Sequence, residues 1–135
     1  MAESFERFFE RRRAAASAYV AGDASPVLAL SVAEGQATFL DPGGGFTEGA
    51  GAVNAANEAG ARTFGPGGTT TLDVRDMAES GDLAFWTGFQ VAEVAMEGRR
   101  VPMRLRVTEA FRRVGGEWRM VHRHASVARG AGREG

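Results

Sequence analysis

The chain has 135 residues, a formal net charge of −1 and no cysteine. Its length predicts one domain with a single core, because domains usually have about 100–200 residues. The lack of cysteine excludes disulfides, thiolate nucleophiles and thiolate metal ligands. All 16 basic residues are arginines, which excludes Schiff-base chemistry and the phosphate-binding lysine of a P-loop.

The distribution of charge and hydropathy excludes several classes of partner. Acidic and basic residues are interleaved, so the chain lacks the basic patch of a nucleic-acid-binding protein. No apolar run approaches the roughly 20 residues that span a bilayer. The amino-terminal segment MAESFERFFERRR is charged and lacks the apolar core of a signal peptide. These features predict a cytoplasmic protein that binds neither membrane nor nucleic acid.

Hydrophobic periodicity predicts three helices in the first half of the chain. Apolar residues recur at steps of three and four between residues 3 and 21. Pro26 is suited to the first turn of a second, short helix that continues to Val32. Residues 48–64 predict a third helix, which Gly51 and Gly60 weaken.

The remaining segments predict strands. Residues 37–40 form a short strand, closed by a turn from Asp41 to Gly45. Beyond Gly68 the period changes to two, and glycine turns separate four predicted strands of an antiparallel meander at residues 69–79, 83–97, 100–114 and 117–127. The predicted domain therefore covers residues 1–127, and the glycine-rich residues 128–135 predict a disordered tail.

Alternation along the strands separates the two faces of the sheet. On the third long strand Glu109 shares a face with five apolar residues: Val101, Met103, Leu105, Val107 and Phe111. On the last strand, periodicity leaves open whether the set containing Arg123 or the set containing His122 and His124 joins that face.

Two stretches of the sequence resemble a known superfamily. LRVTEAFRRVGGEWRMVHRHAS, from Leu105 to Ser126, resembles the end of SnoaL-like and calmodulin-dependent-kinase-association-like domains. ATFLDPGGGFTEGAGAV, from Ala37 to Val53, is similar to the region around the catalytic aspartate of ketosteroid isomerases. Both groups belong to the nuclear transport factor 2-like superfamily. The resemblance implies an α+β fold in which a cone-shaped, curved antiparallel sheet packs against three amino-terminal helices.

The resemblance also implies roles for individual residues. Asp41 falls where the isomerases have a proton-shuttling aspartate, and Glu109 falls where they have a protonated acid that helps to hold an oxyanion. Ala15 falls where they have a tyrosine, which speaks against steroid isomerisation. The cavity-facing positions of the last strand match Val121, Arg123 and Ala125, so both histidines are expected outside the cone.

Each candidate acid has a structural alternative. An aspartate before Pro-Gly commonly caps the amides of its own turn, so Asp41 is either a turn residue or a proton carrier. Glu109 on a buried face must be paired, neutral or catalytic, because an isolated buried charge costs several kcal/mol. It either pairs with Arg123 or remains protonated and donates a hydrogen bond to a ligand oxygen.

Two functional hypotheses follow. In the first, a small apolar molecule enters a cavity and undergoes isomerisation, cyclisation or dehydration without a cofactor. The predicted ligand-binding residues are Tyr19, Phe85, Phe89, Met103, Leu105, Val107, Phe111 and Arg123, with Asp41 and Glu109 as the catalytic pair. In the second, the domain is a non-catalytic assembly or ligand-sensing module.

The outer face of the sheet is predicted to form a homodimer interface, with Trp86, Arg104, Arg106, Trp118, Met120, His122 and His124 as its contact residues. His122 and His124 have the spacing of a strand-borne metal pair, but the chain has no further histidine to act as a third ligand. The prediction is therefore that the chain binds no metal.

Overall fold

The first helix, α1 (Phe5–Val20), forms because apolar residues recur along one side of a segment with a good amino-terminal cap. Ser4 is that cap, and its side-chain oxygen accepts a hydrogen bond from the Arg7 N–H at 3.1 Å. The buried side of α1 contains phenylalanine, alanine and valine side chains, but it also contains Arg12. A buried arginine in an apolar stripe requires a partner elsewhere in the fold.

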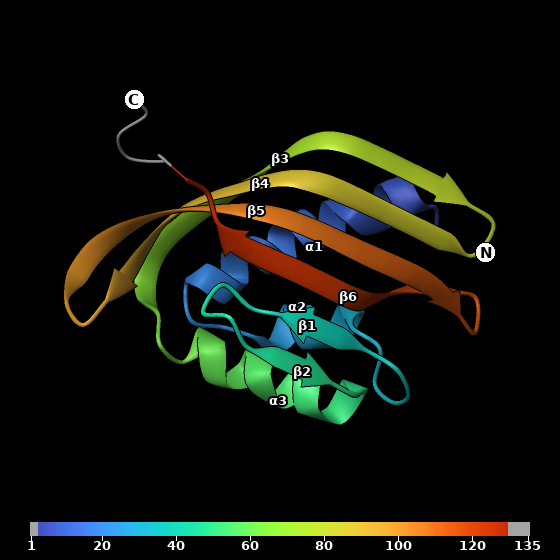
Figure 1. The fold of residues 1–135 in the computed structure, drawn as a ribbon, viewed down its shortest axis with the longest axis horizontal. Helices are drawn as coiled ribbons and strands as arrows, with labels where there is room; N and C mark the ends of the chain where they lie inside the picture. The colour runs from blue at the N-terminus through green and yellow to red at the C-terminus, as the bar shows by residue number, and fades with distance from the viewer. Residues whose placement is uncertain (1–2, 130–135) are drawn as a thin grey trace.

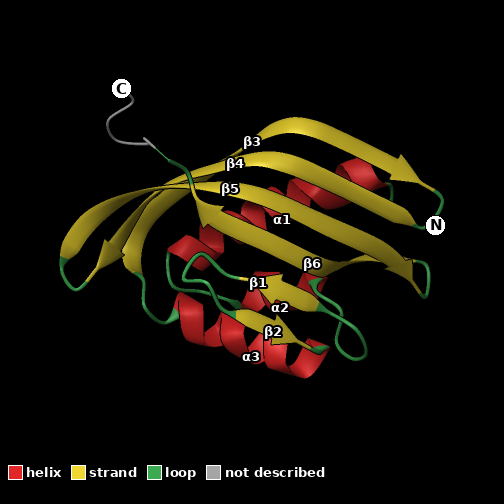
Figure 2. Ribbon diagram, viewed as in Figure 1, coloured by secondary structure: helices red, strands yellow, loops and turns green. Residues whose placement is uncertain are grey.

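The computed structural model describes residues 3–129 of the chain. After α1 come a short helix, α2 (Ser25–Leu30), two short strands, β1 (Thr38–Leu40) and β2 (Phe46–Glu48), and the helix α3 (Ala50–Ala61). Four strands complete the fold: β3 (Gly65–Ser80), β4 (Leu83–Met96), β5 (Arg99–Val114) and β6 (Glu117–Val127). Figure 2 shows the helices on one side of the strongly curved strands.

All six strands belong to one open, mixed sheet with the order β2-β1-β6-β5-β4-β3. The four long strands form the predicted antiparallel meander, and β1 pairs with β6 in parallel. In Figure 1 α1 crosses the concave side of the sheet, while α3 lies beside β1 and β2. The predicted α+β class and the layout of three helices before the meander are confirmed.

Helices α2 and α3 are shorter than predicted, and three strand or tail boundaries also differ from the sequence prediction. Strand β2 was not predicted, because a three-residue edge strand is too short to show a period. Strand β3 begins at Gly65, so the Gly-Pro-Gly-Gly segment belongs to the strand, with an irregular register between Gly65 and Thr69, instead of ending a helix as a turn. Ala128, predicted to begin a disordered tail, is buried, and its N–H donates to the Arg104 carbonyl at 3.0 Å. Residues 130–135 of that tail lie outside the described residues.

An aromatic cluster fills one end of the concave side. Phe5 contacts Phe111 and Trp118, with ring centroids 5.3 and 5.2 Å apart, and Phe9 meets the edge of Trp86 at 5.8 Å. The second half of α1 has smaller residues on its buried side, Ala15, Ala16 and Val20. The core is therefore solid under the first half of α1, and there is space beside its second half.

Three residues predicted for the outer face lie inside the fold instead. Trp86 and Trp118 have 0% of their surface exposed, and Met120 has 6%. Strand β6 contains a β-bulge: Ala110 lies opposite His122 and Phe111 opposite Met120, so Val121 is an extra residue. The bulge reverses the alternation, and Met120 and Arg123 both face inward. Trp86 faces inward because it is paired with Glu109 on β5.

Candidate functional site

A mostly enclosed cavity lies between the second half of α1, helix α3 and the concave side of β4, β5 and β6. Its volume is about 340 Å³, near the lower end of the roughly 300–1,000 Å³ of small-molecule sites. Most of its lining is apolar. It is lined by Arg12, Ala16, Tyr19, Val20, Val27, Phe39, Asp41, Pro42, Ala56, Asn57, Gly60, Thr63, Phe64, Gln90, Met103, Leu105, Met120 and Arg123.

Behind this pocket, Glu109 is fully buried and is shared by two arginines. Arg12 binds it through two hydrogen bonds, from Nε to Oε1 at 2.9 Å and from Nη2 to Oε2 at 2.7 Å. Arg123 Nη1 donates to Oε2 at 2.5 Å, and Trp86 Nε1 donates to Oε1 at 2.7 Å. All four donors favour the ionised carboxylate.

The charge state of Glu109 follows from this environment. Burial by itself raises the pKa of a carboxyl group, but the positive charges of Arg12 and Arg123 oppose it. With the hydrogen bonds from Arg12 and Trp86, they lower the pKa of Glu109 to about 2. Glu109 is therefore ionised and paired with Arg123, which is the first of the two predicted alternatives. Arg12 is an additional partner that was not predicted. Glu109 is not among the residues that line the pocket.

Arg123 is the member of this network that reaches the pocket. Its side chain is 16% exposed, compared with 4% for Arg12. Its Nη2 donates to Gln90 Oε1 at 2.8 Å, and Gln90 Nε2 donates in turn to Thr70 Oγ1 at 3.2 Å. The guanidinium is thus held in one orientation by Glu109 and Gln90 before any ligand binds.

Two further polar groups of the pocket make no side-chain hydrogen bond within residues 3–129. Asn57 is only 7% exposed and lines the pocket from α3. Tyr19 lines it from α1, and burial raises the pKa of its phenol, so the hydroxyl stays protonated near neutral pH. Both groups are therefore available to a ligand as hydrogen-bond donors.

Gly60 explains how Tyr19 fits beside α3. A Cβ atom at residue 60 would lie 2.3 Å from the Tyr19 hydroxyl oxygen, closer than any real Cβ contact. Since Asn57 is three residues earlier on the same helix, the Tyr19 hydroxyl lies near the face of α3 that carries Asn57. The glycine that weakens the helix thus makes room for a polar group of the pocket.

Asp41 lies on the pocket wall, but its carboxylate is used by its own loop. Its Oδ1 accepts hydrogen bonds from the N–H groups of Gly43 at 2.9 Å and Gly45 at 3.1 Å. This is the turn-capping geometry that was predicted as the alternative to a catalytic role for Asp41. Oδ2 accepts no hydrogen bond from the described residues.

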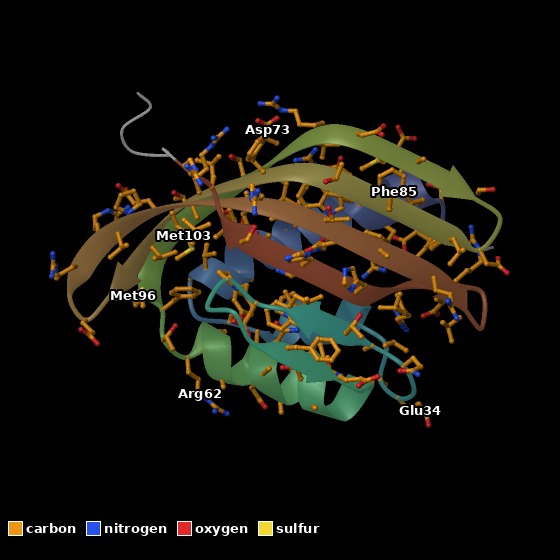
Figure 3. The ribbon with its side chains drawn as sticks, viewed as in Figure 1. Glu34, Arg62, Asp73, Phe85, Met96 and Met103 are labelled. Carbon is orange, nitrogen blue, oxygen red and sulfur yellow. The ribbon has the colours of Figure 1, made fainter. Side chains whose placement is uncertain are left out.

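The predicted ligand-binding residues divide into three groups. Tyr19, Met103, Leu105 and Arg123 line the pocket. Val107 and Phe111 face the same side of the sheet but are buried in the aromatic core. Phe85 and Phe89 were placed wrongly: they lie on the outer face, where Arg75 and Arg104 cover the Phe89 ring at 5.0 and 4.1 Å. Figure 3 shows Phe85 and Met103 towards opposite ends of the sheet.

The two histidines lie on the outer side of β6, opposite to Arg123. His122 Nδ1 and Thr38 Oγ1 are hydrogen-bonded at 2.7 Å, and burial, followed by the charge of His124, lowers the pKa of His122. The described residues contain no cluster of three side chains suited to a metal ion. Trp86, Trp118 and Met120 are buried and cannot belong to the predicted dimer interface. The remaining predicted contact residues on the outer face are Arg104, Arg106, His122 and His124, and dimerisation remains a prediction.

Arg12, Gln90 and Asn57 were not predicted as site residues. The signal for Arg12 was in the sequence, because it occupies an inward position of α1 that apolar residues otherwise fill. Gln90 lies on the same face of β4 as Trp86, and because that face was predicted to point outward, Gln90 was missed together with Trp86. Asn57 had no comparable signal, since α3 is rich in small residues and has no sharply defined apolar side.

Comparison with known proteins agrees with the architecture. The SnoaL-like domain family matches residues 10–130. No curated protein sequence matches the chain significantly. The part of the chain that the structure describes contains no helix long and apolar enough to cross a membrane.

The solved structures that are similar in fold include the following three. An NTF2-like superfamily protein from Salmonella enterica serovar Typhimurium has a TM-score of 0.76 at 17% identity, with 94% of each chain covered. A candidate dehydratase of the NTF2-like family from Streptomyces avermitilis has a TM-score of 0.75 at 19% identity, covering 93% of this chain and 96% of that one. The CaMKII hub from S. rosetta has a TM-score of 0.66 at 20% identity, covering 90% and 94%.

Proposed function

Because the chain belongs to the SnoaL-like domain family, which matches residues 10–130, we propose that it binds a small, largely apolar molecule in the pocket beside α1 and α3. One observation carries this proposal. Arg123, Asn57 and Tyr19 present polar groups to a cavity whose other walls are apolar, and a few convergent polar groups in an apolar concavity are typical of ligand sites.

The elements that form the pocket are suited to holding a ligand in one orientation. Arg123 is fixed by Glu109 and Gln90, so it loses little freedom when a ligand binds. The apolar walls come from α1, α2, β1 and β5, with Val20, Val27, Phe39 and Leu105 as examples. An apolar ligand body would therefore be surrounded on several sides.

A pair of α3 variants tests this proposal. Ala56 lines the pocket and Ala55 beside it is exposed, so Ala56→Leu fills the cavity while Ala55→Leu leaves it open. Leucine and alanine have similar helix propensities, so both variants should fold. In a fragment screen by ligand-observed NMR, fragments that bind the wild type should lose at least about tenfold in affinity with Ala56→Leu, because overpacking the site excludes them.

Ala55→Leu should retain wild-type affinity for the same fragments. Equal binding by the wild type and Ala56→Leu would show that the fragments bind elsewhere, and the proposal would fail. The proposal would also fail if no fragment in the screen bound the wild type.

Proton transfer by Asp41 is a second candidate function. It is favoured by the position of Asp41 on the pocket wall, with Oδ2 free of hydrogen bonds from the described residues. A positioned carboxylate of this kind can accept a proton from a carbon acid in an isomerisation or dehydration. The bonds from Gly43 and Gly45 to Oδ1 would hold it in place during the transfer.

The variant Asp41→Asn separates catalysis from binding. It keeps an oxygen that can accept the loop hydrogen bonds but removes the proton acceptor. For a ligand found in the screen, we expect proton exchange with solvent deuterium to fall by about 10²-fold or more, with an unchanged dissociation constant. Equal exchange by the wild type and Asp41→Asn would remove Asp41 as the base and leave binding as the function.

Assembly of the chain through the outer sheet face is compatible with either function, because that face is on the opposite side of the sheet from the pocket. The similarity in fold to the CaMKII hub supports assembly as a further proposal.

A further inference from the structure

We propose that the pocket selects organic anions: its ligand is a small carboxylic acid in its ionised form, with the carboxylate against Arg123 and an apolar body among the surrounding side chains. This inference rests on the proposed binding function and specifies the class of ligand for the same site.

The first reason is the charge of the buried network. It contains two guanidinium groups, Arg12 and Arg123, and a single carboxylate, Glu109, which gives one net positive charge. An arginine side chain does not release its proton in a protein, so the network cannot become neutral by losing one. A positive charge facing an apolar cavity is stabilised by an anion that enters that cavity.

The second reason is that the protein does not supply this anion itself. Asp41 is the only acidic residue that lines the pocket, and it forms no ion pair with either arginine within the described residues. Its charge is stabilised by the N–H groups of Gly43 and Gly45, at the turn between β1 and β2. The excess positive charge at Arg123 is therefore left for a ligand.

The third reason is the number of hydrogen-bond donors that remain. A guanidinium has five N–H groups, and the described residues engage two from Arg123, one by Glu109 and one by Gln90. The Asn57 amide and the Tyr19 hydroxyl contribute neutral donors from α3 and α1. A carboxylate accepts several hydrogen bonds and donates none, which matches a site in which a charged donor group is accompanied by neutral donors.

The size and walls of the pocket define the rest of the ligand. Met103, Leu105, Met120 and Phe64 contribute apolar surface around the cavity of about 340 Å³. Such a volume is suited to a short aliphatic chain or a single ring and is small for a polycyclic body. The inferred class is therefore arylacetic, short branched-chain and similar monocarboxylic acids.

The test compares an acid with its amide, so that shape is kept while charge changes. Phenylacetate and phenylacetamide are titrated into the wild-type protein near neutral pH by isothermal calorimetry or ligand-observed NMR. We expect the acid to bind at least about tenfold more tightly, because hydrogen bonds to charged groups contribute more than neutral ones. The preference should decrease with added salt less than that of an exposed ion pair, since the site is mostly buried.

Three variants assign the preference to its residue. Arg123→Gln should reduce the acid's affinity to that of the amide, and Arg123→Lys, which keeps the charge but loses the planar fork, should retain part of the preference. Arg100→Gln is the matched control, since Arg100 is an exposed arginine on β5 that pairs with Glu93, and it should behave as the wild type. Thermal unfolding of each variant shows whether it is folded during the titration.

The outcomes distinguish this inference from the binding function on which it rests. Equal affinities of acid and amide in the wild type would overturn the inference and leave small-molecule binding intact. A preference that survived in folded Arg123→Gln would also overturn it, because the charge would then be recognised elsewhere. If neither probe bound, the inference would fail for this class of acid, while the Ala56→Leu screen would still decide the binding function separately.

Discussion

Glu109→Gln is expected to lower the free energy of unfolding by about 3–5 kcal/mol, the range for removing one partner of a buried ion pair. The variant keeps the shape of the side chain but leaves the buried guanidinium of Arg12 and the partly buried guanidinium of Arg123 without a counter-charge. It also places an amide N–H₂ against arginine N–H donors, which cannot accept its hydrogens. Urea denaturation of wild type and variant measures the difference.

The exposed pair Glu93 and Arg100 provides the control. Their nitrogen and oxygen atoms are 2.8 Å apart, as in the buried network, but both side chains are about half exposed. Glu93→Gln should cost less than about 1 kcal/mol, because solvent screens an exposed pair. If both variants lost the same small amount, the burial of Glu109 would have no energetic consequence, contrary to the argument from its environment.

Acidification is expected to remove a comparable amount of stability through the same carboxylate. The pKa of Glu109 is about 2 in the folded protein, compared with 4.5 as its ordinary value. Its folded-state pKa is depressed, so its stabilising contribution is complete above pH 4.5 and disappears as the pH falls towards 2. A shift of this size corresponds to about 3 kcal/mol.

Comparison with Glu109→Gln isolates this contribution from those of other acids. Exposed carboxylates such as Glu3 and Asp73 also have lowered pKa values, because of hydrogen bonds from Arg11 and Arg75, but they are present in both proteins. The difference in unfolding free energy between wild type and variant should therefore shrink between pH 4.5 and 2. A difference independent of pH across that range would show that Glu109 is already neutral in the folded state.

The fold could be predicted from the sequence because its elements are long and regular. Strands of more than ten residues with period two, separated by glycine turns, allow few pairings other than a meander. The prediction of side-chain orientation failed where a strand departs locally from regular alternation. The bulge at Val121 turns Trp118 and Met120 inward, and alternation read along the whole strand cannot reveal one extra residue.

The candidate site was predicted in part, for reasons that can be stated residue by residue. Arg123 and Glu109 were brought together correctly, because they lie on neighbouring strands and share a face. Phe85 and Phe89 were placed inside and Trp86 outside because alternation separates the two faces of β4 without showing which one is buried, and in the structure an outer-face arginine covers Phe89. Arg12 was missed as a partner of Glu109 because the position of α1 over the sheet depends on tertiary packing.

The position of Arg12 also has a consequence for the order of events during synthesis. Arg12 and Glu109 are separated by 97 residues, and the second arginine of the network is still closer to the carboxyl terminus. While the ribosome makes the middle of the chain, α1 can form but has no counter-charge against which to bury Arg12. Burial of Arg12 must therefore wait for β5, which carries Glu109, and the network is complete only when β6, which carries Arg123, has also been translated.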